Sequence, residues 1–208
     1  MGPDAYVTMY PVEGREKVNI GLWPRKAGSW KHREWVLTSQ RAAMETDFRE
    51  WGAIVHKIMD LMEDPPFSAA FYHASQPETV VDRRLCLIGD AAHAMPPHQG
   101  AGAGQAMEDS LVLAEVLGEV KVNVATGSEI KQELKAYERV RTARSQKVLE
   151  TSVQAMDFWS DFHRQDVTVR EASQFAEDAL ERFQWIWHDY LAEQCRQAKD
   201  LLNKPSSS

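Results

Sequence analysis

Residues Leu85 to Asp109 read LCLIGDAAHAMPPHQGAGAGQAMED, and the interpretation of the whole chain starts from this stretch. A short apolar run ends at Gly89-Asp90, two prolines follow, and glycines at positions 100, 102 and 104 lead into a helical pattern. A strand, a glycine-rich turn and a helix start together favour an anion or dipole, because the first helical turn has unpaired N–H groups and about half a positive charge. The glycines remove Cβ atoms, so a flat ligand can lie against the backbone there.

Three ligands are compatible with such a loop. A dinucleotide phosphate turn requires G-x-G-x-x-G, whereas the glycines here run G-x-G-x-G and begin ten residues after the apolar strand ends. A metal bound by Asp90, His93 and His98 would need a second ligand cluster, and the sequence offers none, so we predict no metal. The third ligand is a flavin.

Residues 89–117, GDAAHAMPPHQGAGAGQAMEDSLVLAEVL, resemble the second FAD motif of the flavin-dependent aromatic hydroxylases, the group of salicylate and para-hydroxybenzoate hydroxylase. Other segments resemble this family in the same order. Residues 5–23, AYVTMYPVEGREKVNIGLW, are similar to its substrate-sheet hairpin. Its L-x-x-Y-E-x-x-R-x-x-R helix is matched from Leu134 to Arg144, and WIWHDY at 185–190 resembles a C-terminal segment of fungal members.

The resemblance implies a role for several residues of the loop. Asp90 would hydrogen-bond the ribityl chain of FAD, and Pro97 would lie beside the isoalloxazine ring. The remaining cofactor-binding residues would be Gly100, Gly102, Ala103 and Gly104, and the backbone N–H groups around the last three would face N1 and the C2 carbonyl. A helix N-terminus stabilises the negative charge of a reduced flavin at that edge by roughly 0.3–2 kcal/mol. Tyr10, His93 and His98 are candidates for contact with the substrate or for catalysis. For both histidines, packing against the end of the strand is an equal alternative.

The predicted fold class is α+β, with an antiparallel sheet on the substrate side, a helix after the flavin loop and a helical C-terminal cap. Alternation in AYVTMYPV and KVNIGLW around the turn EGRE predicts an antiparallel hairpin. Strands are also predicted in FSAAFYHA and RLCLIGD. We divide the chain into a substrate-side part at 1–83, a strand-loop-helix part at 84–122 and a helical part at 123–208.

Helical periodicity is predicted over 38–62, with an interruption at Gly52, and over 104–118, from about 127 towards 162 and over 170–202. In the helix after the loop, we expect the apolar residues Met107, Leu111, Ala114 and Leu117 to be buried. Glu108 and Asp109 are expected to favour the helix start electrostatically. Arg141 and Arg144 lie on one helical face and are expected to tie that helix to the core.

Composition narrows the range of partners. The 208 residues carry a formal net charge of −7, which argues against nucleic acid or an anionic membrane as the main partner. No apolar run approaches the roughly 18–20 residues that cross a bilayer. Two distant cysteines in no metal or redox spacing favour a reducing, cytoplasmic setting.

The function implied by the resemblance is FAD-dependent monooxygenation of an aromatic or polyketide-like small molecule with NAD(P)H and O2, in fungal secondary metabolism. The chain contains neither the G-x-G-x-x-G unit with which this family binds the ADP half of FAD nor the arginine placed before the substrate sheet. We therefore expect either a fragment or a shortened relative, as a homodimer or with a partner chain that supplies the nucleotide-binding part. Two alternatives stay open, namely a non-redox binding or assembly subunit and a flavin-fold enzyme of non-oxidative chemistry such as cyclisation.

Overall fold

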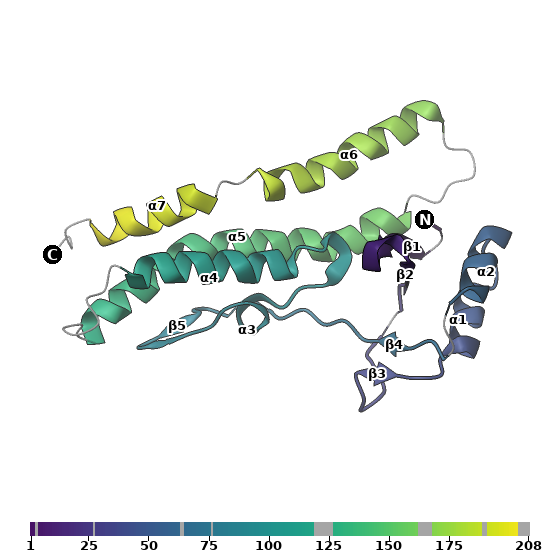
Figure 1. The fold of residues 1–208 in the computed structure, drawn as a ribbon, viewed down its shortest axis with the longest axis horizontal. Coiled ribbons are helices and arrows are strands. Elements are labelled where there is room, and N and C mark those ends of the chain that lie inside the picture. The colour runs from purple at the N-terminus through teal and green to yellow at the C-terminus, as the bar shows by residue number, and fades with distance from the viewer. Residues whose placement is uncertain are drawn as a thin grey trace. The chain divides into compact units, whose positions relative to one another are not determined.

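The computed structural model describes residues 1–2, 4–26, 28–62, 65–75, 77–118, 127–161, 168–188 and 191–203 (Figure 1). The chain forms two compact units, one of residues 1–71 with 156–166 and one of residues 72–155 with 167–208. The predicted boundary near 122 lies outside the described residues, and the three-part division stays a prediction. The mixture of helices and small antiparallel sheets confirms the α+β class.

The first unit begins with the predicted hairpin. Strands β1 (Ala5–Val12) and β2 (Lys17–Pro24) pair antiparallel along their whole length, with Ala5 opposite Pro24 and Val12 opposite Lys17. The connection is the short 3-10 helix η1 (Glu13–Arg15), in which Gly14 has a φ of 67°. A left-handed turn of this kind joins two twisted strands without splaying them, so the sequence EGRE predicted the hairpin correctly.

Two short helices supply the rest of the core of the first unit. Helices α1 (Arg41–Asp47) and α2 (Ala53–Asp60) follow each other, and Gly52 is the N-cap of α2, as the interrupted periodicity predicted. Phe48 and Met59 are buried with Ala5 of the hairpin. Strands β3 (Val36–Leu37) and β4 (Ser68–Ala69) form a separate two-residue ladder.

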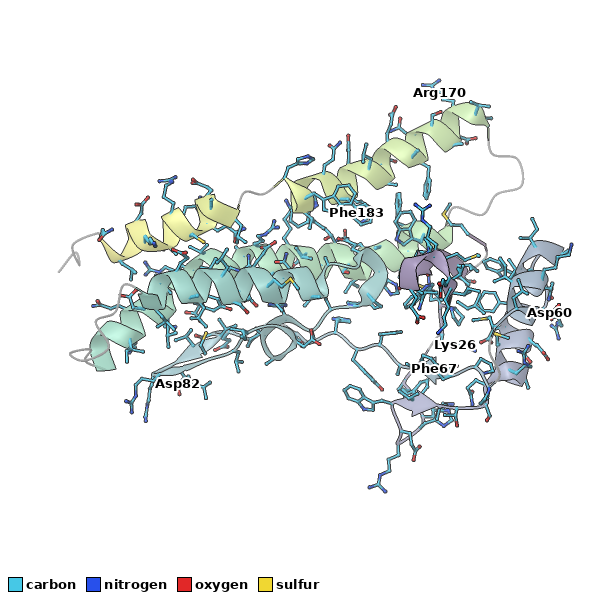
Figure 2. All side chains as sticks on the ribbon, in the orientation of Figure 1. Lys26, Asp60, Phe67, Asp82, Arg170 and Phe183 are labelled. Carbon is cyan, nitrogen blue, oxygen red and sulfur yellow. The ribbon has the colours of Figure 1, made fainter. Side chains whose placement is uncertain are left out.

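The second unit contains the loop and the long helices. Strands β5 (Val81–Asp82) and β6 (Leu85–Cys86) form a hairpin, in whose turn Arg83 has a φ of 53°. Asp82, the last residue of β5, is labelled in Figure 2. The one-turn helix α3 (Asp90–His93) and the 3-10 helix η2 (Pro97–Gln99) lead into α4 (Gly102–Gly118). The C-terminal helices are α5 (Gly127–Asp161), α6 (Val169–Trp187) and α7 (Leu191–Leu202).

The apolar core of the second unit joins α4, α5, α7 and the β5–β6 hairpin. Val112 and Val116 of α4 are fully buried among residues that include Leu134 and Tyr137 of α5 and Ala198 of α7. α6 begins at Thr168, whose side chain forms a capping box with Glu171. Farther along α6, Phe183 is stacked with Trp187, and Figure 2 shows Phe183 on the side of α6 that faces α5.

Two strand predictions were too long. FSAAFYHA contributes only Ser68–Ala69 and RLCLIGD only Leu85–Cys86 to a ladder. A strand persists only where a neighbouring strand pairs with it, and within the described residues each of these segments meets a partner of two residues. The predicted last helix, 170–202, is likewise divided into α6 and α7; residues 189 and 190 of WIWHDY lie outside the described residues.

The predicted inner face of α4 was wrong for Met107, Leu111 and Ala114, which are exposed, whereas Leu117 is partly buried and packs against the core. Met107 is 72% exposed and Leu111 43% exposed, whereas the buried residues of the helix are Gln105, Asp109, Val112 and Val116. These four positions follow a helical period, but two of them are polar. An amphipathic pattern assigns apolar residues to the interior, so it fails where a helix buries a hydrogen-bonded charge instead.

Candidate functional site

The predicted loop begins with a turn that only glycine accommodates well. Gly89 is buried and has a φ of 57° and a ψ of −140°, a backbone conformation that is costly for residues with a Cβ. A Cβ at this position would also lie 3.3 Å from the Cβ of Ala106 in α4. This glycine therefore lets the chain pass close to α4 and turn directly into α3, whose first residue is Asp90.

The carboxylate of Asp109 fixes this turn through two hydrogen bonds. Its side chain is completely buried, and Oδ2 accepts hydrogen bonds from the Gly89 amide at 2.9 Å and from Nε2 of His93 at 2.6 Å. Burial opposes ionisation of Asp109, but hydrogen bonds from His93, Gly89 and Arg141 outweigh it and lower the pKa below the ordinary value of 3.8. Asp109 is thus an ionised, buried anchor.

Arg141 of α5 supplies the positive charge that a buried carboxylate requires. Its side chain is 2% exposed, and Nε donates to Oδ1 of Asp109 at 2.9 Å. A guanidinium has five N–H donors, and all five have acceptors within reach. The other contacts are Glu108 Oε2 at 2.5 Å, Gln194 Oε1 at 2.6 Å, Gln105 O at 3.2 Å and Gln105 Oε1 at 2.9 Å.

Glu108 forms a salt bridge with a second arginine, Arg144. Nε and Nη2 of Arg144 donate to its two carboxylate oxygens at 2.6 and 2.8 Å, a bidentate arrangement that fixes geometry as well as charge. Burial raises the pKa of Glu108, but the hydrogen bond from Arg144 and the charges of both arginines outweigh it and lower the pKa below 4.5. Glu108 and Asp109 therefore connect α4 to α5, which is more than the electrostatic effect on the helix start that we expected of them.

Helix α5 also fixes the proline-glycine part of the loop. The hydroxyl of Ser152, which is fully buried, donates to the carbonyl of Pro96 at 2.8 Å. Gly100 follows η2 in the left-handed conformation with a φ of 64°, and its N–H donates to the carbonyl of Pro97. The loop is consequently anchored before its glycines by α5 and turned at Gly100 into the start of α4.

The amides at the start of α4 can accept a flat, electron-rich ligand. The first intrahelical donor is Gln105, which bonds the carbonyl of Ala101 at 3.0 Å, so the N–H groups of residues 102–104 have no acceptor within the helix. Ala103 and Gly104 are exposed, and a Cβ built on Gly104 would meet no atom within 4 Å other than its chain neighbours and the adjacent helix backbone. A Cβ built on Gly102, by contrast, would lie 3.7 Å from Cγ of Met95. The N–H groups of residues 102–104 are thus donors that a ligand with acceptor atoms could bind.

The structure places most of the predicted site residues on one continuous segment. Asp90 is exposed at the first position of α3, Pro97 is half-buried at the first position of η2, and His98 follows it. Burial lowers the pKa of His98 from its ordinary value of 6.5, which keeps the ring neutral at neutral pH. His93 is 5% exposed and bonded to Asp109, so the packed alternative describes its position.

Tyr10 belongs to the other unit. It lies near the end of β1, is 53% exposed and pairs with Asn19 of β2.

The sequence did not lead us to assign a functional role to the residues that anchor the loop, although most of them lie in the family motifs described above. Two further residues of the L-x-x-Y-E-x-x-R-x-x-R helix contact the segments next to β5 and β6. Tyr137 donates to the carbonyl of Leu87 at 3.4 Å, and Glu138 accepts from the amide of Val80 at 2.8 Å. The expectation that Arg141 and Arg144 tie their helix to the core is correct. Their acceptors, Glu108 and Asp109, could have been suspected from two adjacent carboxylates in a helix with only one other charged residue, Glu115.

Two kinds of site are absent from the described residues. No cluster of three or more His, Cys, Asp or Glu side chains there is arranged to hold a metal ion. Among the described helices, none combines the length and apolar character that a bilayer crossing demands.

Comparisons with known proteins agree with the geometry of this loop. The family model for the FAD binding domain matches residues 16–152, and the chain belongs to this family. The 6-methylsalicylate 1-monooxygenase atA of Aspergillus terreus (strain NIH 2624 / FGSC A1156) is 32% identical over 211 residues, which cover 100% of this chain and 46% of that protein. Salicylate hydroxylase of Pseudomonas putida is 30% identical over 213 residues, covering 97% of this chain and 46% of that protein.

A solved structure, a salicylate hydroxylase substrate complex, superposes with a TM-score of 0.82 at 30% identity and covers 100% of this chain and 49% of that one. The fold is therefore that of part of this family. The chain spans about half the length of the curated relatives it matches.

Proposed function

We propose that this chain forms the flavin-ring and substrate side of an FAD-dependent monooxygenase that hydroxylates a small aromatic or polyketide-like molecule with NAD(P)H and O2. The observation that carries the proposal is the set of N–H groups at residues 102–104, which have no acceptor within α4, on a helix bonded to α5 through buried Asp109 and Arg141. Membership of the FAD-binding family and the names of the relatives, a 6-methylsalicylate monooxygenase and a salicylate hydroxylase, support it.

In this proposal, the residues of the loop bind and orient the cofactor. Asp90 holds the ribityl chain, Pro97 lies beside the ring, and the amides of residues 102–104, which Gly100 turns into position, face the pyrimidine edge. The flavin, when bound, supplies the activation of O2 and the transfer of oxygen. The positive end of α4 stabilises negative charge at that edge.

Catalysis and assembly are the finer parts of the proposal. His98, neutral because of its burial, is a candidate for contact with the substrate or for proton transfer, and Tyr10 is a candidate for substrate contact from the hairpin. For the assembly we propose either a homodimer or a partner chain that supplies the nucleotide-binding part. The free thiols of Cys86 and Cys195 are consistent with the cytoplasm, where we place the enzyme.

A pair of glycines in α4 tests the proposal. Gly104→Ala adds a Cβ that tilts towards the helix N-terminus and into the open space before the amides, whereas Gly118→Ala adds one at the far end of the same helix. Both replacements favour the helix by up to about 1 kcal/mol. We expect Gly104→Ala alone to weaken FAD binding, by about tenfold or more.

The measurement is a titration of the purified full chain with FAD, followed by flavin fluorescence and by absorbance of the retained flavin. Salicylate-stimulated oxidation of NADH then separates a hydroxylase from a flavin-fold cyclase. A colourless protein that FAD does not reconstitute would contradict the proposal for this chain and favour the non-redox binding role. Equal FAD affinity in the two alanine variants would remove the amides of α4 from the site.

A further inference from the structure

The Asp109 carboxylate connects two points that enclose a single helical turn. Its Oδ2 atom accepts from the amide of Gly89, the N-cap of α3, and from the ring of His93, the last residue of α3. The single atom Oδ2 is therefore hydrogen-bonded to both ends of residues 89–93, the segment that contains Asp90. We infer that Asp109 is a positioning residue for the flavin site, acting through Gly89 and His93 on Asp90; this inference rests on the proposed function.

The segment needs such a clamp because it has little stability of its own. A helix of four residues forms one turn, and the first turn of a helix costs more conformational entropy than its hydrogen bonds return. Gly89 adds an unfavourable entropy, because glycine has more backbone freedom to lose than any other residue. Without a fixed partner for its amide and for His93, the exposed side chain of Asp90 would sample many positions.

The clamp can keep its charge because Arg141 completes it. Oδ1 of Asp109 is bonded to Nε of Arg141, which leaves Oδ2 for the turn. With the carboxylate ionised, Oδ2 can only accept, so Nε2 of His93 is the donor of the short contact. Arg141 is itself held by Gln194 of α7, so the C-terminal helix supports the same geometry.

Glu138 provides a matched control, because it is a second carboxylate that anchors a backbone amide in the same unit. It accepts from the Val80 amide at 2.8 Å and from Lys135 Nζ at 2.6 Å, and neither donor belongs to α3. If Asp109 were merely one of many stabilising contacts, Asp109→Asn and Glu138→Gln would have similar consequences. If Asp109 positions the turn, only Asp109→Asn changes residues 89–93.

The experiment compares the full-length wild type, Asp109→Asn, Glu138→Gln and His93→Gln by hydrogen exchange and by FAD titration. Asp109→Asn keeps the size of the side chain but cannot accept from all three donors. We expect amide exchange in residues 89–93 to accelerate about tenfold or more beyond any change in α5 residues 134–150, and FAD affinity to fall about tenfold. His93→Gln leaves the pair of Asp109 and Arg141 intact and gives a smaller local change, which keeps the test decisive if Asp109→Asn does not fold.

Unchanged exchange at 89–93 in both loop variants, or an equal rise across α5 and in Glu138→Gln, would overturn the inference. Loss of FAD affinity in Glu138→Gln as large as in Asp109→Asn would overturn it as well. If the wild type fails to bind FAD, the proposed function fails, and the exchange measurement still decides whether Asp109 positions the turn.

Discussion

The two units of this chain differ in the kinds of side chain that they bury. In the first unit, Phe48 and Met59 pack against Ala5 of the hairpin, with Trp51 beside Phe48 at a centroid distance of 5.1 Å. The second unit combines an apolar cluster, which includes Val112 and Val116, with a buried ion pair of Asp109 and Arg141. An apolar core accepts any side chain of similar volume, whereas a buried ion pair accepts only the groups that complete its hydrogen bonds.

The largest expected effect comes from Arg141→Ala, which leaves Asp109 and Glu108 without their shared cation. Removing one partner of a buried pair costs about 3–5 kcal/mol, because the remaining charge stays uncompensated. Arg141→Lys is also costly, since an ammonium group cannot reproduce the fork that reaches Asp109, Gln105 and Gln194 together. Urea unfolding measures both; a lysine variant as stable as the wild type would contradict this account of the core.

Phe48→Ala should cost about 3 kcal/mol, because it empties a fully buried aromatic site in the first unit. Here, however, the conservative replacement is tolerated: Phe48→Leu should cost less than about 1.5 kcal/mol, since it retains most of the apolar volume. Hydrogen exchange read by mass spectrometry assigns each loss to its unit. If Phe48→Leu destabilised as strongly as Arg141→Lys, the contrast between the two cores would not hold.

The smallest expected effect is a dependence of stability on pH in the second unit. The pKa of Asp109 and that of Glu108 are lower in the folded chain than their ordinary values of 3.8 and 4.5, so folding favours the ionised carboxylates. Their contribution is complete above about pH 5 and is lost as the pH falls through the folded values. Unfolding midpoints between pH 7 and pH 3 should show this loss, and Glu108→Gln should reduce its slope. An identical slope in the variant would exclude Glu108 as a source.

Local sequence signals were sufficient for much of the fold. Alternating residues around EGRE predicted the hairpin, and Gly52 marked the break between α1 and α2. The helix from about 127 does continue to Asp161. These features depend on contacts between residues close in sequence, whose geometry is set by backbone preferences and turn chemistry.

The candidate site was predicted only in part. The order of Gly89, Asp90, Pro97 and the three glycines indicated a loop before a helix, and the structure has that loop. The direction in which α4 faces was predicted incorrectly, because Met107 and Leu111 were taken as interior residues. Their exposure follows from the burial of Asp109, a position to which the apolar pattern gave no weight.

By itself, the sequence determined the family of the chain, the positions of its main helices and its hairpin, and the glycine turn that leads into α4. Only the tertiary structure decided which polar groups are buried. Asp109 meets Arg141 from 32 residues away, and Arg141 meets Gln194 from 53 residues away. A charged side chain can be buried only when other groups pair with it and satisfy its hydrogen bonds. Here those groups lie on segments far apart in sequence, so a local sequence pattern does not reveal them.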